Sequence, residues 1–151
     1  MKEFLTWKQI QTAAEDVAET ISFNNPGEMP TCILAIARGG LVPATLIAYE
    51  LEIKNVYIAR ASSYSNDNAK GSLNIEIPDI EKLRNQHVLI VDDLSDSGDT
   101  LFAIVKEVKS VTEEITTATL YIKRGTAYEP DVNHRSFPKE TWLVFPWEQL
   151  I

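Results

Sequence analysis

The sequence predicts an α/β fold in which helices flank a parallel twisted sheet. Three short apolar runs rich in β-branched residues, at 31–37, 88–91 and 115–122, are typical of strands that are buried on both faces. The first two runs are each followed by a turn and then by residues with helical apolar spacing, at 41–51 and 101–108. Strands that alternate with helices in this way form parallel sheets, which bind ligands at their carboxyl edge.

The composition is that of an ordinary globular protein. Of the 151 residues, 44% are hydrophobic and 24% are charged, and this length predicts a single domain over residues 1–151. The formal net charge of −8 argues against a nucleic-acid-binding surface, which needs clustered lysine and arginine. The first residues lack the layout of a signal peptide, and no apolar run approaches the ~18 residues of a membrane span, so we expect a cytoplasmic protein. The single cysteine, Cys32, excludes an internal disulfide and is expected in the core.

An amphipathic helix is expected near the start of the chain. Thr6, with Gln9 three residues later, predicts a capping box, and the turn residues at 24–27 end the helix. Apolar residues recur at helical spacing between these two signals, namely Trp7, Ile10, Ala14, Val17 and Ile21. Because Trp7 shares this apolar face, we expect it to pack against the protein rather than to bind a ligand.

A strand, a turn with two glycines and a helix follow at 31–51. Arg38 stands at the carboxyl end of the strand, where a guanidinium suits a bidentate contact with phosphate oxygens. Gly39 and Gly40 permit unusual backbone angles beside it. This turn is therefore a candidate phosphate-binding loop.

A polar segment separates the next two predicted strands. Residues 55–60 and 73–77 have the character of strands, and residues 62–74 are rich in Ser, Asn, Asp and Gly. A segment of this length is typical of a surface loop or of a lid over an active site, and composition alone favours the surface loop. Residues 78–84 then form a turn or a short helix.

The most informative stretch is 88–100, where a strand, an acidic turn and the start of a helix follow one another. The apolar run ends at Asp92 and Asp93, and Ser97 and Gly98 precede the helix. Free N–H groups and the helix dipole at such a turn favour a phosphate. Several carboxylates at the same turn would repel a phosphate unless a divalent cation or ribose hydroxyls bind them. The turn therefore predicts a sugar phosphate with Mg²⁺ as its ligand.

The last part of the chain contains one clear strand and an aromatic segment. The strand at 115–122 is followed by Lys123, residues 130–138 look irregular, and residues 140–147 are rich in aromatic side chains. Charged side chains that each follow a predicted strand are expected to meet in one crevice at the carboxyl edge of the sheet, namely Arg38, Asp92, Asp96 and Lys123.

These motifs resemble those of a known family. Residues 91–100 match the binding motif for phosphoribosyl diphosphate (PRPP) of type I phosphoribosyltransferases, in which Asp-Asp-x-x-Asp-Ser/Thr-Gly-x-Thr follows a hydrophobic strand. Over nearly the whole chain the layout resembles one branch, the small bacterial xanthine-guanine phosphoribosyltransferases. Further matching residues are Arg38-Gly39-Gly40-Leu41-Val42-Pro43, Ser62-Ser63-Tyr64, Lys123, Thr141-Trp142-Leu143 and Pro146-Trp147.

The resemblance implies a fold, a reaction and an assembly. The fold is that of type I phosphoribosyltransferases, with a small hood and a flexible lid loop beside the sheet. The reaction is the Mg²⁺-dependent transfer of phosphoribose from PRPP to N9 of a 6-oxopurine, namely guanine, xanthine or hypoxanthine, in purine salvage. Its products are a nucleoside monophosphate such as GMP and pyrophosphate. The expected assembly is a homodimer or a homotetramer.

The resemblance also assigns roles to individual residues. The expected catalytic residues are Arg38, Asp96 and Lys123. Those expected to bind PRPP or the nucleotide are Arg38, Gly39, Lys70, Asp92, Asp93, Asp96, Ser97, Gly98, Asp99 and Thr100. Those expected to bind the purine are Asp96, Lys123, Trp142 and Leu143, and those of the lid are Ser63 and Tyr64.

The residue types fit the purine site. The carboxylate of Asp96 can take or share the N7 proton as N9 attacks. The ammonium of Lys123 can donate a hydrogen bond to O6, which selects oxopurines over aminopurines. The indole of Trp142 can stack on the base, and backbone groups of Leu143 can contact its 2-position.

The two adjacent aspartates and two unusual positions complete the predicted site. Asp92 and Asp93 are neighbours at a strand end, so we expect their side chains to point to opposite sides and not to form an acid/base dyad. Asp93 is the expected metal ligand, and Asp92 is expected to act through water. Ala37 departs from the small polar residue often found in purine members of the family. Asp99 stands where glycine or a basic residue is common, which would weaken binding of the 5′-phosphate.

Two other functions stay open at this stage. A non-catalytic regulator that binds PRPP or a nucleotide would keep the same fold, but the presence of both Asp96 and Lys123 favours an enzyme. An enzyme that acts on a pyrimidine or another acceptor is the second alternative, against which Lys123 and Trp142 favour a purine. The preference among the three oxopurines depends on backbone geometry near Leu143, so the sequence does not predict it.

Overall fold

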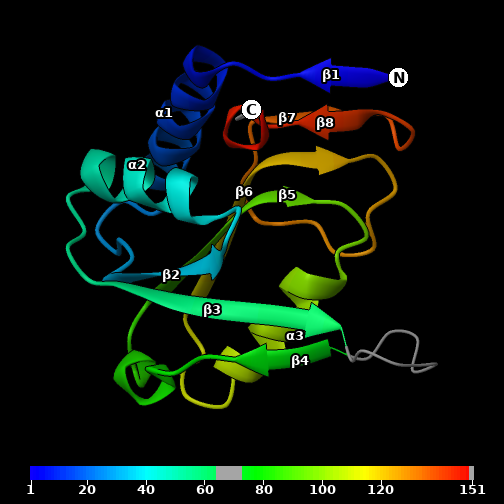
Figure 1. Cartoon of the computed structure of the whole chain (residues 1–151). Coiled ribbons are helices and arrows are strands. Elements are labelled where there is room, and N and C mark those ends of the chain that lie inside the picture. Colours follow the sequence, from blue (N-terminus) through cyan, green and yellow to red (C-terminus); the bar gives the residue numbers. More distant parts are fainter. Residues whose placement is uncertain (64–72, 150–151) are drawn as a thin grey trace.

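The structure is a computed structural model that describes residues 1–63 and 73–149 (Figure 1). Its strands are β1 (Lys2–Phe4), β2 (Cys32–Ala37), β3 (Val56–Ser63), β4 (Leu73–Glu76), β5 (Val88–Ser95), β6 (Ile115–Lys123), β7 (Arg135–Phe137) and β8 (Trp142–Val144). Its helices are α1 (Trp7–Asn24), α2 (Leu41–Leu51) and α3 (Asp99–Val108), with short 3₁₀ helices at Ile80–Leu83 and Pro146–Glu148.

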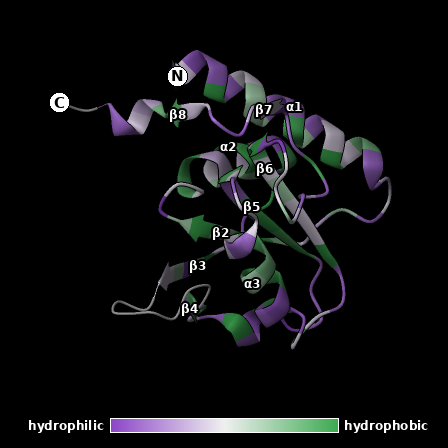
Figure 2. Ribbon diagram, turned by 90° about the vertical axis from the view of Figure 1, so that its right-hand side faces the viewer, coloured by the Kyte–Doolittle hydropathy of each residue, from purple (hydrophilic) through white to green (hydrophobic). Residues whose placement is uncertain are grey.

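Six strands form one sheet in the order β4-β3-β2-β5-β6-β7. All neighbours in this sheet are parallel except β4, which is antiparallel to β3. Helices flank the sheet on both faces (Figures 1 and 2), and the hydrophobic residues concentrate in its central strands. The predicted α/β fold with a mainly parallel sheet is confirmed.

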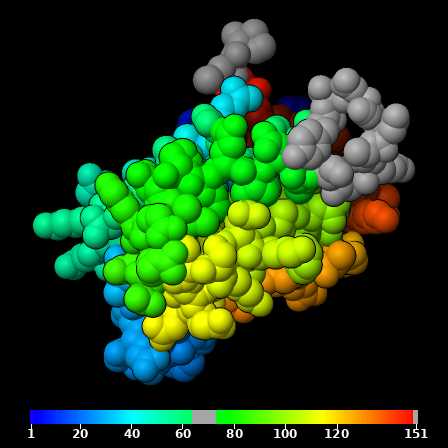
Figure 3. All heavy atoms as spheres, turned by 90° about the horizontal axis from the view of Figure 1, so that it is seen from below, coloured from blue at the N-terminus to red at the C-terminus, as the bar shows by residue number. Residues whose placement is uncertain are grey.

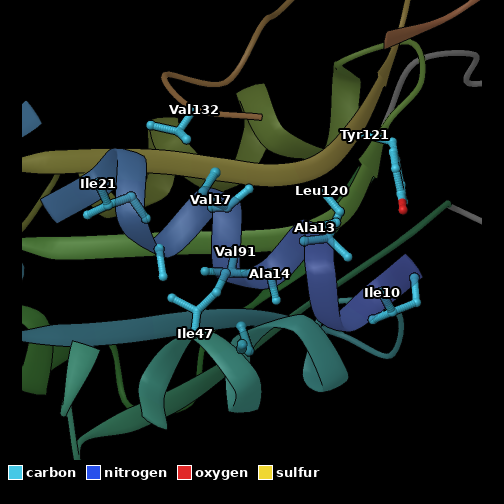
Figure 4. Packing of buried hydrophobic residues seen from close by; sticks show 14 of the residues in the cluster. Ile10, Ala13, Ala14, Val17, Ile21, Ile47, Val91, Leu120, Tyr121 and Val132 are labelled. Atoms are coloured by element: carbon cyan, nitrogen blue, oxygen red, sulfur yellow. The ribbon is translucent and has the colours of Figure 1, made fainter. Parts of the chain in front are cut away.

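Alternate residues of the central strands belong to two hydrophobic cores on opposite faces of the sheet. In β2, Ile33 and Ala35 pack with α1 and α2, whereas Leu34 and Ile36 pack with α3 and Leu83. This alternation is what strands buried on both faces require. Figure 4 shows the first core from close by, and Figure 3 shows α3 and the residues around β4 covering the second.

The first helix forms as the sequence predicts. The Thr6 side chain accepts a hydrogen bond from the Gln9 N–H at 3.1 Å, and the Gln9 side chain accepts one from the Thr6 N–H at 2.8 Å. This capping box satisfies N–H groups that have no partner within the helix. Trp7 is 55% exposed, and its packing partner is Trp147, with the ring centroids 6.0 Å apart.

The strands at the carboxyl edge run further than the apolar runs suggest. The prediction that the central strand ends at Asp92 is wrong, because β5 continues to Ser95. In the same way β3 continues to Ser63 and β6 includes Lys123. The cause is pairing between neighbours, since Asp92 lies opposite Thr119 and Ser95 opposite Ile122, so hydrogen bonds with β6 hold polar residues in the strand.

Two further strands lie where the sequence gives no strand pattern. Residues 130–138, expected to be irregular, contain β7, which extends the sheet beside β6. The aromatic segment near the end contains β8, which pairs in parallel with β1 as a separate two-stranded sheet. This small sheet and the 3₁₀ helix at Pro146–Glu148 form the predicted hood (Figure 1).

No helix within the described residues is long and apolar enough to cross a membrane.

Candidate functional site

The site lies at the carboxyl edge of the sheet, where β2, β5 and β6 are adjacent. Their ends carry Arg38, Asp96 and Lys123, as the sequence predicts. The Nζ atom of Lys123 lies 4.0 Å from Oδ1 of Asp96 and donates a hydrogen bond of 3.4 Å to the backbone oxygen of Lys139. The Lys123 side chain is 7% exposed and that of Asp96 is 68% exposed, so a buried cation faces a carboxylate that solvent can reach.

The turn after β2 packs directly against the acidic end of β5. The peptide bond between Ala37 and Arg38 is cis, and the Arg38 residue is exposed. A Cβ atom at Gly39 would overlap the Asp93 carboxylate, and one at Gly40 would lie 2.6 Å from the Val91 backbone oxygen. Both glycines are therefore needed for this close approach, which places the Arg38 loop beside Asp93.

The two adjacent aspartates interact with each other. Oδ1 of Asp92 accepts a hydrogen bond from the Asp93 N–H at 2.8 Å. Asp92 lines the pocket at the turn between β5 and α3, whereas the Asp93 carboxylate lies against Gly39, and that the two side chains point to opposite sides stays a prediction. Both residues are half-buried, and two neighbouring carboxyl groups disfavour ionising together.

Burial and neighbouring charge raise the pKa of both carboxyl groups. Burial and the neighbouring charge of Asp93 raise the pKa of Asp92 well above its usual value. Burial also raises the pKa of Asp93, against the opposing effect of hydrogen bonds from Asp92 and the Leu94 backbone, and the charge of Glu148 adds to the increase. A cation bound at these carboxylates would favour their ionised forms.

The turn between β5 and α3 has free hydrogen-bond donors. Gly98 has φ of +94° and, as the N-cap residue of α3, makes no side-chain capping bond. The Ser97 hydroxyl accepts a hydrogen bond from the Asp99 N–H at 3.2 Å, and the Asp99 residue is exposed. A pocket of about 100 Å³ lies here, lined by Asp92, Leu94, Ser95, Asp96, Ser97, Gly98, Thr100 and Leu101. Such a helix start is suited to a phosphate.

Residues 124–128, which the sequence did not identify, support this turn. The Ser97 backbone oxygen accepts a hydrogen bond from the Ala127 N–H at 2.9 Å. A Cβ atom on Gly98 would lie 2.5 Å from the Tyr128 backbone nitrogen and 2.9 Å from the Thr126 hydroxyl. The turn between β5 and α3 is thus packed so closely against residues 124–128 that only glycine fits at position 98.

Buried hydroxyl groups strengthen this contact. The Ser95 side chain donates to the Tyr128 backbone oxygen at 3.1 Å and lies 3.3 Å from the Thr126 hydroxyl. The Thr126 N–H in turn donates to the Lys123 backbone oxygen at 3.1 Å. The same short segment therefore touches both the turn expected to bind phosphate and the residue expected to bind the purine. Its only sequence signal was the glycine-containing turn after the strand at 115–122.

The remaining predicted residues lie in the hood and beside β3. Trp142 is 66% exposed and Leu143 is 7% exposed, and the Trp142 N–H donates to the Met1 backbone oxygen at 2.8 Å. Ser63 pairs with Leu73, at the end of β3. Two other predicted residues lie outside the described part of the chain, namely Tyr64 and Lys70.

Asp92 and Asp93 are the residues that could hold a divalent cation. Within residues 1–63 and 73–149, no three His, Cys, Asp or Glu side chains come together as a metal-binding group. Two carboxylates nevertheless fit Mg²⁺, which commonly binds one or two protein carboxylates and takes its other ligands from substrate phosphates and water.

Comparisons with known proteins agree with this geometry. A profile of the phosphoribosyl transferase domain family matches residues 1–149. Xanthine-guanine phosphoribosyltransferase from Cereibacter sphaeroides is 30% identical over 149 residues, which cover 97% of this chain and 87% of that protein. The crystal structure of a purine phosphoribosyltransferase from Pyrococcus horikoshii is 34% identical with a TM-score of 0.85, covering 99% of this chain and 95% of that one. A Neisseria gonorrhoeae protein solved with bound ppGpp is 27% identical with a TM-score of 0.81, covering 99% and 90% of the two chains.

Proposed function

The chain belongs to the phosphoribosyl transferase domain family, and from that membership we propose that it is a purine-salvage enzyme acting on a 6-oxopurine. It transfers phosphoribose from PRPP to N9 of guanine, xanthine or hypoxanthine and releases pyrophosphate. The observation that carries the proposal is the 4.0 Å pairing of Lys123 with Asp96 beside the phosphate-binding turn. The names of the relatives from C. sphaeroides and P. horikoshii support a purine acceptor.

Lys123 and Asp96 recognise different atoms of the base. The buried ammonium of Lys123 donates to O6, and it would meet a donor rather than an acceptor in the 6-amino group of adenine. The Asp96 carboxylate accepts the N7 proton as N9 forms its bond to the sugar. Trp142 stacks on the base from the hood, and the backbone of Leu143 contacts its 2-position.

The phosphates are held by backbone groups and by Arg38. The 5′-phosphate binds at the start of α3, where Ser97, Gly98, Asp99 and Thr100 supply N–H groups and hydroxyls. The exposed Arg38 and the backbone of Gly39 bind the pyrophosphate, which leaves as a highly charged group. These contacts fix the sugar between the base and the leaving group, which is the geometry that transfer requires.

Asp92 and Asp93 fit a role with Mg²⁺ and the ribose. Asp93 holds the ion, and Asp92 contacts the ribose hydroxyls or water bound to the ion. When bound, Mg²⁺ neutralises charge that develops on the departing pyrophosphate. The raised pKa values of both carboxyl groups support this assignment, because such a pair is poorly placed to stay ionised without a cation.

The proposal is tested by pyrophosphate release from PRPP and Mg²⁺ with guanine, xanthine, hypoxanthine, adenine and uracil in parallel. Turnover confined to the oxopurines, and lost when Mg²⁺ is chelated, would support the proposed reaction and rank its substrates. Binding of PRPP or GMP without turnover of any base would instead support a regulatory protein of the same fold. Turnover with uracil alone would support a pyrimidine acceptor.

For the assembly we propose a homodimer or homotetramer, working in the cytoplasm. Light scattering across the concentrations used for the activity assay tests the assembly. A protein that stays monomeric while it turns over substrate would contradict it.

A further inference from the structure

A second pocket lies between the start of α1 and the strands β6 and β7. Its volume is about 150 Å³, several times the ~30 Å³ that one water molecule occupies. The polar side chains that line it are Lys8, Gln9, Thr12, Tyr121, His134 and Arg135. None of these residues lines the pocket at the phosphate-binding turn, so the two pockets are distinct.

The Tyr121 hydroxyl opens into this pocket. Tyr121 is only 2% exposed, and its ring packs edge-on against Phe137 with centroids 5.5 Å apart. Among the described residues, 1–63 and 73–149, the Tyr121 hydroxyl has no hydrogen-bond partner. No side-chain polar atom of these residues is both fully buried and without a partner. Tyr121 lines the pocket, and Figure 4 shows its hydroxyl directed away from β6 on the side where α1 begins.

This hydroxyl is a hydrogen-bond donor at neutral pH. Burial raises the pKa of Tyr121, and the nearby positive charge of Arg135 partly opposes that effect. Arg135 is the register partner of Tyr121 across β6 and β7, and its guanidinium lies 4.4 Å from the centre of the Phe137 ring. A donor and a cation are thus placed side by side at the pocket.

The other charges around the pocket are also favourable to an anion. Lys8 lies in the first turn of α1, which contains no acidic residue and lies at the positive end of the helix dipole. No acidic residue of the described ranges lines the pocket, although the whole chain has a net charge of −8. The Asp16 carboxylate is hydrogen-bonded to Nδ1 of His134, which lines the pocket, at 2.8 Å. The second ring nitrogen of His134 is not used in that contact.

We propose that this pocket binds a small oxyanion of the phosphoryl type. The Tyr121 hydroxyl and the Arg135 guanidinium would donate to its oxygens, and Lys8 and the start of α1 would supply further positive charge. The proposal does not depend on the transferase reaction, because no residue of this pocket takes part in it. A bound anion would connect α1 with β6 and β7, which are far apart in the sequence.

The test is a titration of ¹⁵N-labelled protein with inorganic phosphate at pH 7, followed by amide chemical shifts, with sodium chloride at equal ionic strength as reference. In the wild-type protein we expect saturable shifts at Lys8, Gln9, Thr12 and Arg135. The amides of residues 96–100 report separately on the phosphate-binding turn, so the result stands whether or not the chain is a transferase.

Four variants make the titration specific. Tyr121→Phe keeps the packed ring and removes the hydroxyl, and we expect phosphate to bind roughly tenfold more weakly at the second pocket. Arg135→Gln is expected to weaken it at least as much, whereas Arg84→Gln, on the opposite face of the sheet and paired with Glu81, should behave as wild type. Absence of saturable shifts at these amides, or equal affinity in all variants, would overturn the proposal. Lys8→Gln changes an exposed residue, so it provides a second weakened variant if a core substitution impairs folding.

Discussion

The Nζ atom of Lys123 and Oδ1 of Asp96 are 4.0 Å apart, which is beyond hydrogen-bonding distance. The two groups therefore attract each other without a direct bond that a ligand would have to break. A donor and an acceptor at this spacing can contact neighbouring atoms on one edge of a bound base. O6 and N7 of a 6-oxopurine are such a pair of atoms, which is why this relationship carries the proposed function.

Asp96→Asn tests the role of the carboxylate. Asparagine keeps the size of the side chain but cannot take a proton at neutral pH, so we expect kcat to fall by roughly 10²- to 10⁴-fold. KM for PRPP should change little. Steady-state kinetics with guanine and PRPP measure both constants, and Asp79→Asn, the same change at an exposed residue beside the 3₁₀ helix, is the control. A kcat within a few-fold of wild type would exclude Asp96 as the base.

Gly98→Ala tests the tight packing of the phosphate-binding turn. Alanine at a positive φ costs roughly 1–2 kcal/mol, and here its Cβ would also lie 2.5 Å from the Tyr128 nitrogen. We expect lower stability and a rise of about tenfold or more in KM for PRPP, because the donors at the start of α3 would be displaced.

Gly27→Ala is the matched control for this substitution. Gly27 has a similar φ of +86°, but a Cβ there has nothing within 4 Å. Gly27→Ala should therefore lower the free energy of unfolding only by the cost of placing alanine at a positive φ. It should leave KM for PRPP unchanged. If both variants lose the same stability and keep the same KM, the contact with Tyr128 does not position the turn.

The sequence predicted those parts of the site that depend on local pattern. The strand, turn and helix around 88–108 have strong periodic signals, and the Thr6–Gln9 capping box is encoded by two residues three apart. Placement of Lys123 near Asp96 followed from parallel topology, because both residues come at the ends of neighbouring strands.

What the sequence did not predict depends on contacts between distant segments. β1 and β8 are each only three residues long and stabilise one another across the length of the chain, so neither shows a periodic pattern alone. The packing of Tyr128 and Thr126 on Gly98 likewise joins segments that lack any shared motif. The hydrogen bond from the Asp93 N–H to Oδ1 of Asp92 was not predicted either, because alternation along a strand gives the side of each Cβ atom but not the hydrogen bonds of the side chain.

Trp142→Ala tests whether the exposed indole binds the purine. Stacking of a base on an aromatic side chain contributes about 1–3 kcal/mol, so KM for guanine should rise roughly tenfold or more, with kcat and KM for PRPP little changed. Phe23→Ala is the control, because Phe23 is 82% exposed and lies in the last turn of α1. If KM for guanine is unchanged in Trp142→Ala, the indole belongs to the hood surface alone.

Asp92→Asn tests whether the pKa of Asp92 is raised in the folded protein. The test is the pH dependence of stability. The pKa of Asp92 is raised in the folded protein, whereas in the unfolded chain it is about 3.9. The folded state therefore holds a proton over a pH range in which the unfolded state has lost it, so this group lowers stability as the pH rises above about 4 through its folded-state pKa. Asparagine does not ionise and can still accept the Asp93 N–H hydrogen bond.

We accordingly expect Asp92→Asn to gain stability relative to wild type at pH 8 and to lose that advantage towards pH 4.5. Urea unfolding at a series of pH values without Mg²⁺ measures this difference, and Asp79→Asn should follow the wild-type curve throughout. Added Mg²⁺ should stabilise the wild-type protein more than the variant, because binding to the folded state alone raises the free energy of unfolding. A stability difference that is constant with pH, or that grows towards acid, would contradict the raised pKa. An unchanged response to Mg²⁺ would mean that the ion binds without Asp92.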